Sequence, residues 1–585
     1  MRYRWHELEG IAIAGSGAAR SSATVGAAIV AALLRQRGHG TPAAVEAFLS
    51  PTPQTLAEPL LLADLDRAIA RLRLAHARQE LVAIWGDYDV DGLTSTTLLC
   101  RALGGMGLRV RPLIPHRTRD GYGLNIAGIA RLAGEGVRLI VAVDCGISDR
   151  AEIDHARSCG VDVIVLDHHT IPPEMPEAAA VVNPRRADCA YPFKDHAAVG
   201  IAYTLVRALA REPFVCGGAW SEDEPELVDL LGLAALGTVA DVAPLQGENR
   251  TIVTWGLDAL RHTAYPGVQA LCAVAGIDRA RLTAWDLGHA LGPRLNAAGR
   301  MADPAPALRL LLTDSYEEAL PLAQELDRLN RERQRELSRI LEEAIARVEH
   351  DGLPDETRPI LQVDGTGWTA GVVGLVAGRL AERYGRPAIV LERGATMSTG
   401  SARSVDGFNL VEALAECADL LDRFGGHARA AGLTVANHKL DELRERLLTR
   451  ARARLTADDL RPTLTLDLEL ALADLTYPTV DALARLEPFG QGNPEPLILL
   501  RDVGTQWPKT SGDGKHLFFI ATAQAGRPVR APVRCVAFGQ GARRPDLLDP
   551  ARGGVDLVGT LRRERWQGEE RLSFHIRDFR RAGSV

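Results

Sequence analysis

Residues 81–95 place three aspartates between an apolar strand and an apolar helix. In LVAIWGDYDVDGLTS, five apolar residues precede Asp87, Asp89 and Asp91, and the run that follows predicts a helix over 93–103. Carboxylates at the end of such a strand lie at the crevice edge of an open α/β sheet, where these folds bind ligands. Like charges this close repel one another, and a divalent cation would keep them ionised. An acidic turn of solvated aspartates is the alternative; the pattern favours a metal site.

Polar side chains follow three further apolar segments in the same way. Two of these segments are predicted strands and the third is a predicted helix. Because parallel strands bring their carboxyl ends to one edge, we expect the groups to converge there. Carboxylate and imidazole ligands together suit Mn²⁺, and Mg²⁺ is the alternative where oxygen ligands dominate. The segments are 139–143, 161–166 and 227–236, and the residues that follow them are Asp144, then Asp167, His168 and His169, then Asp241.

The order of predicted elements indicates an α/β chain of several domains. Strands alternating with helices predict a parallel, doubly wound sheet. Helices predicted over 24–37, 41–49 and 60–79 are expected to flank that sheet. Residues 315–349 predict one long, heavily charged helix, and after residue 461 short β-like segments between Gly and Pro turns predict a small antiparallel barrel.

Composition narrows the class of protein. A hydrophobic share of 46% and a charged share of 24% are typical of a globular chain. The net charge of −7 argues against a uniformly basic DNA-coating protein, although residues 527–585 hold thirteen arginines and seven acidic residues. Eight scattered cysteines without a C-x-x-C pair suit a reducing compartment. Without an apolar membrane span or a signal-peptide core, the sequence is expected to be cytoplasmic, with no membrane partner.

Several motifs together resemble a known family. Four of them, in order, are similar to the motifs of the DHH phosphoesterase superfamily: GDYDVDG, VDCG, LDHH and GTVADVAPL. From about residue 33 onward the fuller resemblance is to the RecJ family within that superfamily. It is carried by RGHGTPAAVEAFLSP, RDGYGL, GPRLNAAGRM, LNRERQ, GSARSVDGFNL, GGHARAAG and EPFGQGNPEP.

The resemblance implies a domain plan. It consists of a parallel-sheet DHH catalytic domain and a smaller α/β DHHA1 domain joined by a long helix, with a C-terminal β-barrel of the OB-fold type. The expected bounds are an N-terminal helical segment 1–80, the DHH domain 81–314, the connecting helix 315–350, the DHHA1 domain 351–460 and the OB-fold 461–585.

The resemblance also implies an activity. It predicts an exonuclease that degrades single-stranded DNA 5′→3′ to mononucleotides in DNA recombination and repair, using two Mn²⁺ or Mg²⁺ ions. Single-stranded DNA is the expected partner, with a single-strand-binding protein and a repair helicase as further expected partners. One alternative is a DHH phosphodiesterase of short oligonucleotides or cyclic dinucleotides. The long connecting helix and the barrel count against that phosphodiesterase. The other alternative is an inactive single-strand-binding relative, which the retained ligands disfavour.

The resemblance assigns roles to the strand-end residues. One ion would be held by Asp89 and Asp144. The other would share Asp144 as a bridge, and Asp87 would be an extra ligand or would position one. His169 would donate a proton or stabilise the transition state, and Asp167 would orient the histidines. The full ligand set of the second ion would be Asp91, Asp144, His168 and Asp241.

Seven more residues are expected to contact DNA. Arg117 is either a phosphate contact or a solvated loop arginine, and GPRLNAAGRM is expected to be a DNA-contacting loop rather than a structural turn. His427, in a Gly-rich turn, either contacts DNA or caps backbone. Thr369 stands where relatives commonly have a histidine, in Trp-His-x-Gly. The complete set of expected DNA contacts is Arg117, Arg294, Asn296, Arg300, Ser401, Arg403 and His427.

Overall fold

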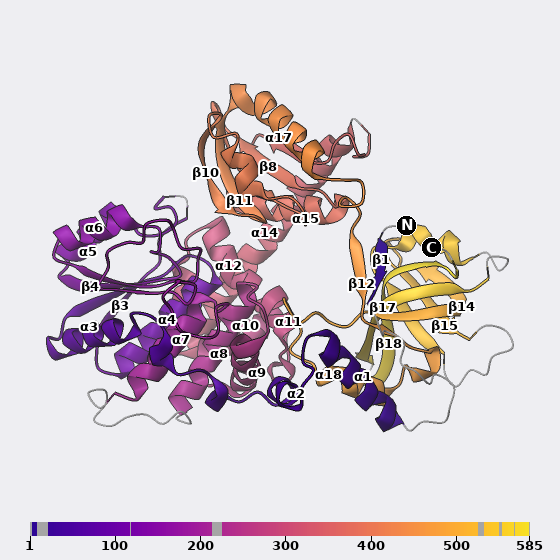
Figure 1. Ribbon diagram of the computed structural model, residues 1–585, viewed down its shortest axis with the longest axis horizontal. Coiled ribbons are helices and arrows are strands. Elements are labelled where there is room, and N and C mark those ends of the chain that lie inside the picture. The colour runs from indigo at the N-terminus through magenta and orange to yellow at the C-terminus, as the bar shows by residue number, and fades with distance from the viewer. Residues whose placement is uncertain are drawn as a thin grey trace.

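The computed structural model contains three folded bodies, two of which are joined by a long helix (Figure 1). Its described residues are 3–8, 22–117, 119–212, 225–350, 352–523, 532–548, 553–566 and 568–583.

The first body is built on a five-stranded parallel sheet with the order β3-β2-β4-β5-β6. Side chains at alternate strand positions enter two different cores, so both faces are buried, as parallel sheets require. Helices α5 and α6 pack on one face, and α3, α4 and α7 on the other. The predicted parallel sheet is therefore confirmed. Its elements are α3 Leu65–Ala77, β2 Leu81–Trp85, α4 Val90–Gly105, β3 Arg109–Leu113, α5 Ile126–Gly134, β4 Val137–Val143, α6 Arg150–Ser158, β5 Asp162–Leu166, β6 Ala180–Val182 and α7 Ala198–Ala210.

More helices continue this body as far as the long helix. They extend the core that contains α4 and α7. The segment GPRLNAAGRM, expected to be a loop, is helix α12. The helices are α8 Pro225–Ala240, α9 Gly247–His262, α10 Pro266–Ala275, η3 Arg279–Arg281, α11 Ala284–Asp286, the π-helical turn η4 Leu287–Leu291, α12 Gly292–Met301 and α13 Ala305–Leu312.

The N-terminal helices do not all flank the first sheet, contrary to expectation. Only α3 does. Helices α1 (Ser22–Gln36) and α2 (Pro42–Leu49) pack with the C-terminal body, where Ile29 and Phe48 enter its core. The close approach of α1 to α18 explains the choice, because a Cβ on Gly26 would lie 3.1 Å from the Cβ of Ala482. Two short turns, η1 Pro53–Thr55 and η2 Pro59–Leu61, lead from α2 to α3.

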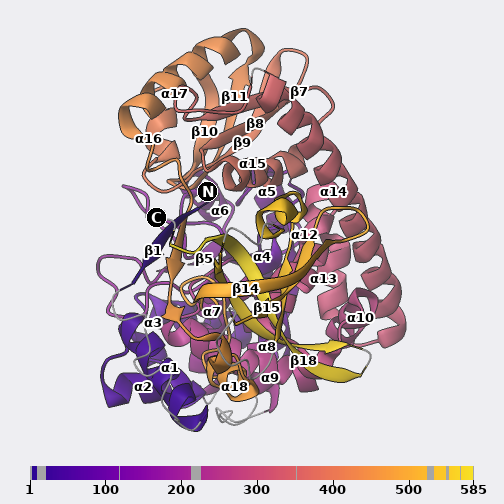
Figure 2. The same cartoon turned by 90° about the vertical axis from the view of Figure 1, so that its right-hand side faces the viewer.

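Helix α14 (Tyr316–His350) joins the first body to the second, and Figure 2 shows it running up one side of the molecule. Its 35 residues make it about 50 Å long. The first half buries Leu326 in the core of the parallel-sheet body, whereas the second half buries Ile340 in the core of the next one. The long helix predicted from the sequence is therefore confirmed.

The second body has the sheet order β10-β11-β9-β8-β7, parallel only between β7 and β8. The segment GSARS lies at the end of strand β9 and not in a turn. Its small residues Gly400 and Ala402 are buried at alternate positions, which is the period of a strand. The elements are β7 Leu361–Gly365, α15 Ala370–Tyr384, β8 Ala388–Arg393, β9 Met397–Arg403, α16 Leu410–Ala415, β10 Leu421–His427, β11 Ala430–Ala436, η5 Asn437–Lys439 and α17 Leu440–Arg454.

The third body is the predicted barrel. Its strand order is β13-β14-β15-β16-β18-β17, and β14 closes it on β17. It is not wholly antiparallel as expected, because β13–β14 and β16–β18 are parallel pairs. Strand β1 (Arg4–Glu7) pairs with β12 outside it. The other elements are β12 Thr463–Leu466, β13 Leu468–Glu469, η6 Leu472–Asp474, α18 Tyr477–Ala484, β14 Ile498–Thr510, β15 Leu517–Thr522, β16 Val533–Ala537, η7 Gly541–Leu547, β17 Val555–Trp566 and β18 Glu569–Arg581.

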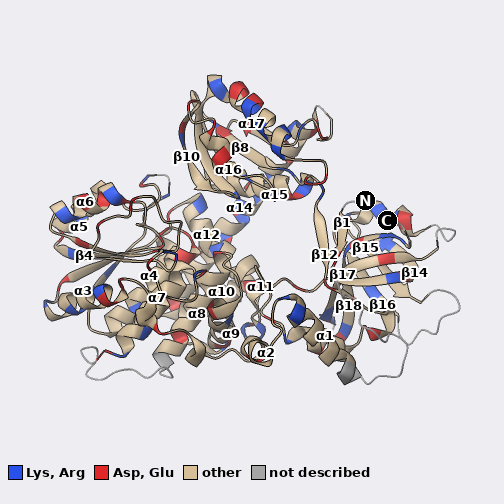
Figure 3. Cartoon of the chain, in the orientation of Figure 1, with Lys and Arg blue, Asp and Glu red and all other residues tan. Residues whose placement is uncertain are grey.

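Charge is distributed over the whole molecule. Figure 3 shows basic and acidic residues intermixed on all three bodies rather than one uniformly basic face. Among the described residues, none of the helices combines the length and the apolar character that crossing a bilayer would need.

Candidate metal and nucleic-acid site

The structure brings the strand-end side chains together at one edge of the parallel sheet. Their ligand atoms form three overlapping groups, and within each group the atoms lie within 4.8 Å of one another. Asp144 and His168 each belong to two groups. The convergence predicted from the strand ends is therefore observed. The groups are Asp87, Asp89 and Asp144; Asp91, His168 and Asp241; and Asp144, His168 and His169.

The aspartate segment after β2 is tied down by the start of α4. Asp89 is the N-cap residue, and its carboxylate accepts the backbone N–H of Asp91 and of Gly92. Helix α4 begins at Val90, three residues before the predicted start, because this cap lies within the aspartate motif. Gly92 is required here, since a Cβ on it would lie 2.4 Å from the backbone N and O of Asp87.

Asp91 meets the N-terminus of a second helix. Its two oxygens accept the backbone N–H groups of Ala198 and Val199, at 2.7 and 2.9 Å, in the first turn of α7. The Asp91 side chain is fully buried. The positive end of the α7 dipole therefore stabilises a carboxylate in this position.

Asp144 is central to the cluster and adopts a strained backbone conformation. Its φ of 63° lies in the left-handed region, which is uncommon for a residue other than glycine and recurs at functional sites. Its Oδ1 lies 3.2 Å from His168 Nε2 and 4.0 Å from His169 Nδ1. The Tyr122 hydroxyl donates to its carbonyl oxygen at 3.0 Å and lies 3.3 Å from His169 Nδ1.

Asp167 has a different environment from the other aspartates. Its carboxylate accepts the backbone N–H groups of Ile147, His168 and His169, and His169 Nδ1 donates to it at 2.7 Å. Burial would raise the pKa of Asp167, but the hydrogen bond and charge of His169 outweigh it and lower that pKa. Burial would likewise lower the pKa of His169, and Asp167 instead raises it to about 9. Asp167 therefore orients His169.

The donor set fits divalent cations. Burial, and then the charge of a neighbouring aspartate, raises the pKa of Asp91 to about 7 and that of Asp241 to about 9. The pKa values of Asp87 and Asp144 shift upward for the same reasons. Burial lowers the pKa of His168 to about 3, so its imidazole is neutral.

Two atoms of the cluster also lack hydrogen-bond partners. Within the described residues, Asp87 Oδ1 and His168 Nε2 are buried without one. Neutral imidazole and crowded carboxylates are the ligands that Mn²⁺ and Mg²⁺ accept, so the residues fit the expected ions.

Three of the expected DNA-contacting arginines gather beside the acidic cluster. The guanidinium of Arg117 lies 5.1 Å from the ring centre of Tyr88, in the aspartate segment. Burial and then the charge of Arg117 lower the pKa of both Arg300 and Arg403, reaching about 10 in Arg300. Guanidinium groups that lie close enough to repel one another form a binding site for an anion such as a phosphate.

Of the other expected DNA contacts, Ser401 and Asn296 lie near this arginine group, whereas Arg294 does not. A Cβ on Gly374 of α15 would lie 3.2 Å from Ser401 Oγ and 3.5 Å from Arg403 Nη2, so Ser401 borders the group. Asn296 is half-buried one helical turn before Arg300, on the same side of α12. Arg294 is engaged elsewhere, because its Nε donates to Asp327 of α14 at 3.0 Å.

The second body contributes His427 to the site. Its ring is stacked on that of His169, with centroids 6.1 Å apart and planes inclined by 13°. Thr369, at the position where relatives commonly have a histidine, donates a hydrogen bond to Glu336 of α14 at 3.0 Å. The threonine therefore has a structural contact here.

Two features of the site were not predicted from the sequence. Tyr122 was not singled out, although it lies in the Gly-rich RDGYG motif that follows β3. The amides at the start of α7 could not be identified, because backbone N–H groups leave no residue-type signal in a sequence.

Comparison with known proteins identifies the family. Family models match residues 81–238 (DHH family, N-terminal domain), 358–454 (DHHA1 domain) and 466–578 (RecJ OB domain). The "Single-stranded-DNA-specific exonuclease RecJ" of Dickeya dadantii is 41% identical over 448 residues, which cover 74% of this chain and 77% of the relative. This chain belongs to the RecJ family. The RecJ of Bacillus subtilis is 37% identical, over 94% of this chain and 67% of its own.

Solved RecJ structures have the same architecture. RecJ from Thermus thermophilus in complex with Mn²⁺ matches with a TM-score of 0.82 at 30% identity, over 100% of this chain and 80% of its own. The same protein in complex with Mg²⁺ matches with a TM-score of 0.75. The predicted fold class, a DHH domain and a DHHA1 domain with a C-terminal OB-fold, is therefore confirmed.

Proposed function

We propose that this RecJ-family protein degrades single-stranded DNA 5′→3′ to mononucleotides by metal-dependent phosphodiester hydrolysis. The observation that supports this most directly is the convergence of five carboxylates and two histidines at one sheet edge, beside an arginine group. The RecJ relatives are named single-stranded-DNA-specific exonucleases. The acidic cluster and the arginine group of this chain are suited to the same activity, the hydrolysis of a single DNA strand.

Two cations are proposed for the acidic cluster. Asp89 and Asp144 would hold one, and Asp87 would assist them. When bound, the pair supplies an ionised water and neutralises charge on the attacking and leaving oxygens. Mn²⁺ and Mg²⁺ are both candidates, because ligands of both kinds are present. The second cation would be held by Asp91, Asp144, His168 and Asp241.

The remaining residues of the site bind, orient and transfer protons. His169, held as an imidazolium by Asp167, would donate a proton to the leaving oxygen or stabilise its charge. The arginine group would hold the 5′ phosphate of the strand, with Ser401 beside it. His427 would close on the scissile phosphate from the second body.

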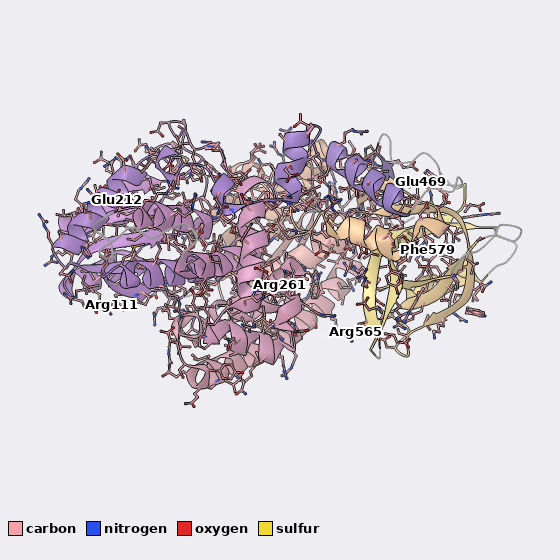
Figure 4. The ribbon with its side chains drawn as sticks, turned by 90° about the horizontal axis from the view of Figure 1, so that it is seen from below. Arg111, Glu212, Arg261, Glu469, Arg565 and Phe579 are labelled. Carbon is pink, nitrogen blue, oxygen red and sulfur yellow. The ribbon has the colours of Figure 1, made fainter. Side chains whose placement is uncertain are left out.

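The barrel is proposed to hold the strand beyond the catalytic groove. Trp507 and Phe538 are large aromatic residues with exposed fractions of 74% and 57%, available for base stacking. A cavity of about 1030 Å³ separates the barrel from the parallel-sheet body, lined by Arg261 of α9 and Arg562 of β17. Figure 4 labels Arg261 and Arg565, on α9 and on β17 respectively. The side chain of Trp566 lies outside the described residues.

The cellular setting is proposed on the same basis. A role in DNA recombination and repair, a cytoplasmic location, and a single-strand-binding protein and a helicase as partners all follow from the proposed substrate. Neither alternative activity gains support from the site. The barrel exceeds what a dinucleotide would need, and no carboxylate or imidazole of the expected ligand set is replaced.

Strands labelled at either end test the proposal. With Mn²⁺, the wild-type protein should release mononucleotides from the 5′ end of a single strand and leave a duplex intact. Asp144→Ala should abolish release, whereas Asp162→Asn, at the far end of β5, should not. Release from the 3′ end, or an active Asp144→Ala protein, would contradict the proposal.

A further inference from the structure

The first turn of α9 holds separate segments of the chain through three consecutive side chains. Glu248 accepts the backbone N–H of Ala57, the Tyr191 hydroxyl and His196 Nε2. Asn249, the next residue, contacts the two segments that lead to the acidic cluster. The third side chain, Arg250, donates to three backbone carbonyl oxygens, those of Phe48, Leu486 and Glu487.

Asn249 bridges two carbonyl oxygens with one amide group. Its Nδ2 donates to the carbonyl of Asp195 at 2.6 Å and to that of Pro244 at 3.0 Å. The residue is fully buried. Because no water can replace a lost partner at such a position, both bonds constrain the distance between the two segments.

The first of these segments leads directly to the amides that hold Asp91. Asp195 lies three residues before Ala198, whose N–H is donated to Asp91. Between them, His196 is bonded to Glu248 and packs against Gly200, where any Cβ would lie 2.7 Å from its Nδ1. The start of α7 is therefore held from α9 as well as by its packing on the sheet.

The second segment carries Asp241. Pro244 lies three residues after it, and Val242 between them has a φ of 62°, a strained value for a β-branched side chain. The segment is not covered on its outer side, since Val242 is 64% exposed. A strained, partly exposed segment needs an anchor to hold one position, and the Asn249 bond to Pro244 is one.

We infer that Asn249 is a positioning residue that sets the distance between Asp91 and Asp241 and thereby the affinity of the second cation. This inference rests on the proposed two-cation site. Mg²⁺ demands near-ideal octahedral geometry with ligand oxygens at about 2.0–2.1 Å, and any small divalent cation shared by two carboxylates binds less well when the distance between them drifts. Residues that orient ligands in this way typically change metal affinity by about 10–100-fold.

Mn²⁺ binding to the metal-free protein tests this, with free Mn²⁺ measured by electron paramagnetic resonance. Asn249→Leu keeps the branching of the side chain and removes both N–H donors, and it should weaken one of two Mn²⁺ sites about 10–100-fold while leaving the other unchanged. Arg250→Met is the matched control. It removes buried hydrogen bonds from the same helical turn, so it should lower Tm without changing either Mn²⁺ affinity.

The outcomes separate this inference from the proposed function. If the wild-type protein takes up no Mn²⁺, the two-cation site itself is wrong. If it takes up two ions and Asn249→Leu binds both equally well, only the positioning role is wrong. An equal loss of affinity in Arg250→Met would also overturn it, since the effect would then be general loosening. Should Asn249→Leu not fold, His196→Gln tests the other anchor of the same segment and should weaken the same site.

Discussion

The imidazole rings of His169 and His427 lie parallel to each other, although they belong to different bodies. His169 follows β5 of the parallel sheet, and His427 ends β10 of the second sheet. Burial, and then the charge of His169, lowers the pKa of His427, so the pair consists of one imidazolium and one neutral ring. A phosphate entering between the bodies would therefore meet both rings at once.

Replacing His427 should impair catalysis without disturbing the metal centre. We expect His427→Ala to lower kcat on single-stranded DNA about 100-fold, the usual cost of removing one transition-state contact. Its Mn²⁺ affinity should remain that of the wild-type protein, because His427 belongs to none of the three ligand groups. Arg423→Ala, an exposed position in the same strand, controls for damage to β10. A weakened Mn²⁺ site in His427→Ala would contradict this assignment.

The arginine group should confer a preference for a 5′ phosphate. Arg403→Met removes a guanidinium that pairs with no carboxylate among the described residues, so it should raise KM for a 5′-phosphorylated strand more than for one with a 5′ hydroxyl. Tm should stay the same or rise, because the substitution removes a buried charged group whose burial costs folding free energy. Arg294→Met is the counterpart. It breaks the ion pair with Asp327, so it should lower Tm and leave the preference intact. A loss of the preference in Arg294→Met alone would reverse these two roles.

The convergence of the proposed metal ligands that follow strands could be predicted from the sequence, because one geometric rule applies to them. Strands of a parallel sheet end at the same edge, so Asp89, Asp144 and His168 had to converge once their segments were recognised as strands. The long helix could be predicted from the sequence equally well. Its apolar stripe continues over 35 residues, and no glycine interrupts it.

The structures of the proposed DNA-contacting segments were harder to predict, because glycines and small residues occur in loops, helices and strands alike. The segment GPRLNAAGRM predicts a loop, but it forms α12, where a Cβ on Gly299 would come within 2.8 Å of the Tyr88 carbonyl oxygen. Gly400 lies in strand β9, where a Cβ would come within 2.1 Å of the Val390 carbonyl oxygen. The packing of α1 against the barrel could not be predicted either, because an apolar helical face does not specify which part of the protein it packs against.

Metal removal should make stability depend on pH. The pKa values of Asp91 and Asp241, about 7 and about 9, lie above those of the unfolded chain. The folded metal-free protein therefore keeps protons that the unfolded chain has lost, and its stability falls as pH rises from about 6 to about 9. Bound Mn²⁺ holds the carboxylates ionised and should remove this fall.

Thermal unfolding with and without a chelator at both pH values measures the effect. The increase in Tm on adding Mn²⁺ should be larger at about pH 9 than at about pH 6, because metal competes with protons for the same oxygens. Asp241→Asn should reduce the pH dependence of the metal-free protein. A Tm that does not change with pH after metal removal would contradict the coupling.

Trp507 should be a stacking platform on the barrel. It lies at the irregularity of β14 between Gln506 and Lys509, with a φ of 51° and 74% of its surface exposed. A large ring held in solvent on a strained backbone contributes little to folding. Trp507→Ala should therefore leave Tm unchanged and weaken binding of a long single strand about tenfold, as expected for the loss of one stacked base. Filter binding with catalytically inactive Asp144→Ala protein measures this without digestion.

Strand length and a buried aromatic provide the controls for Trp507. A short oligonucleotide that occupies only the catalytic groove should bind Trp507→Ala as well as it binds the protein with Trp507, because it does not reach the barrel. Phe519→Leu changes a ring that is 2% exposed in the barrel core, so it should lower Tm and leave DNA affinity unchanged. If Trp507→Ala weakens the short and the long strand equally, the ring acts near the catalytic groove, and the barrel is not the holding site for the downstream strand.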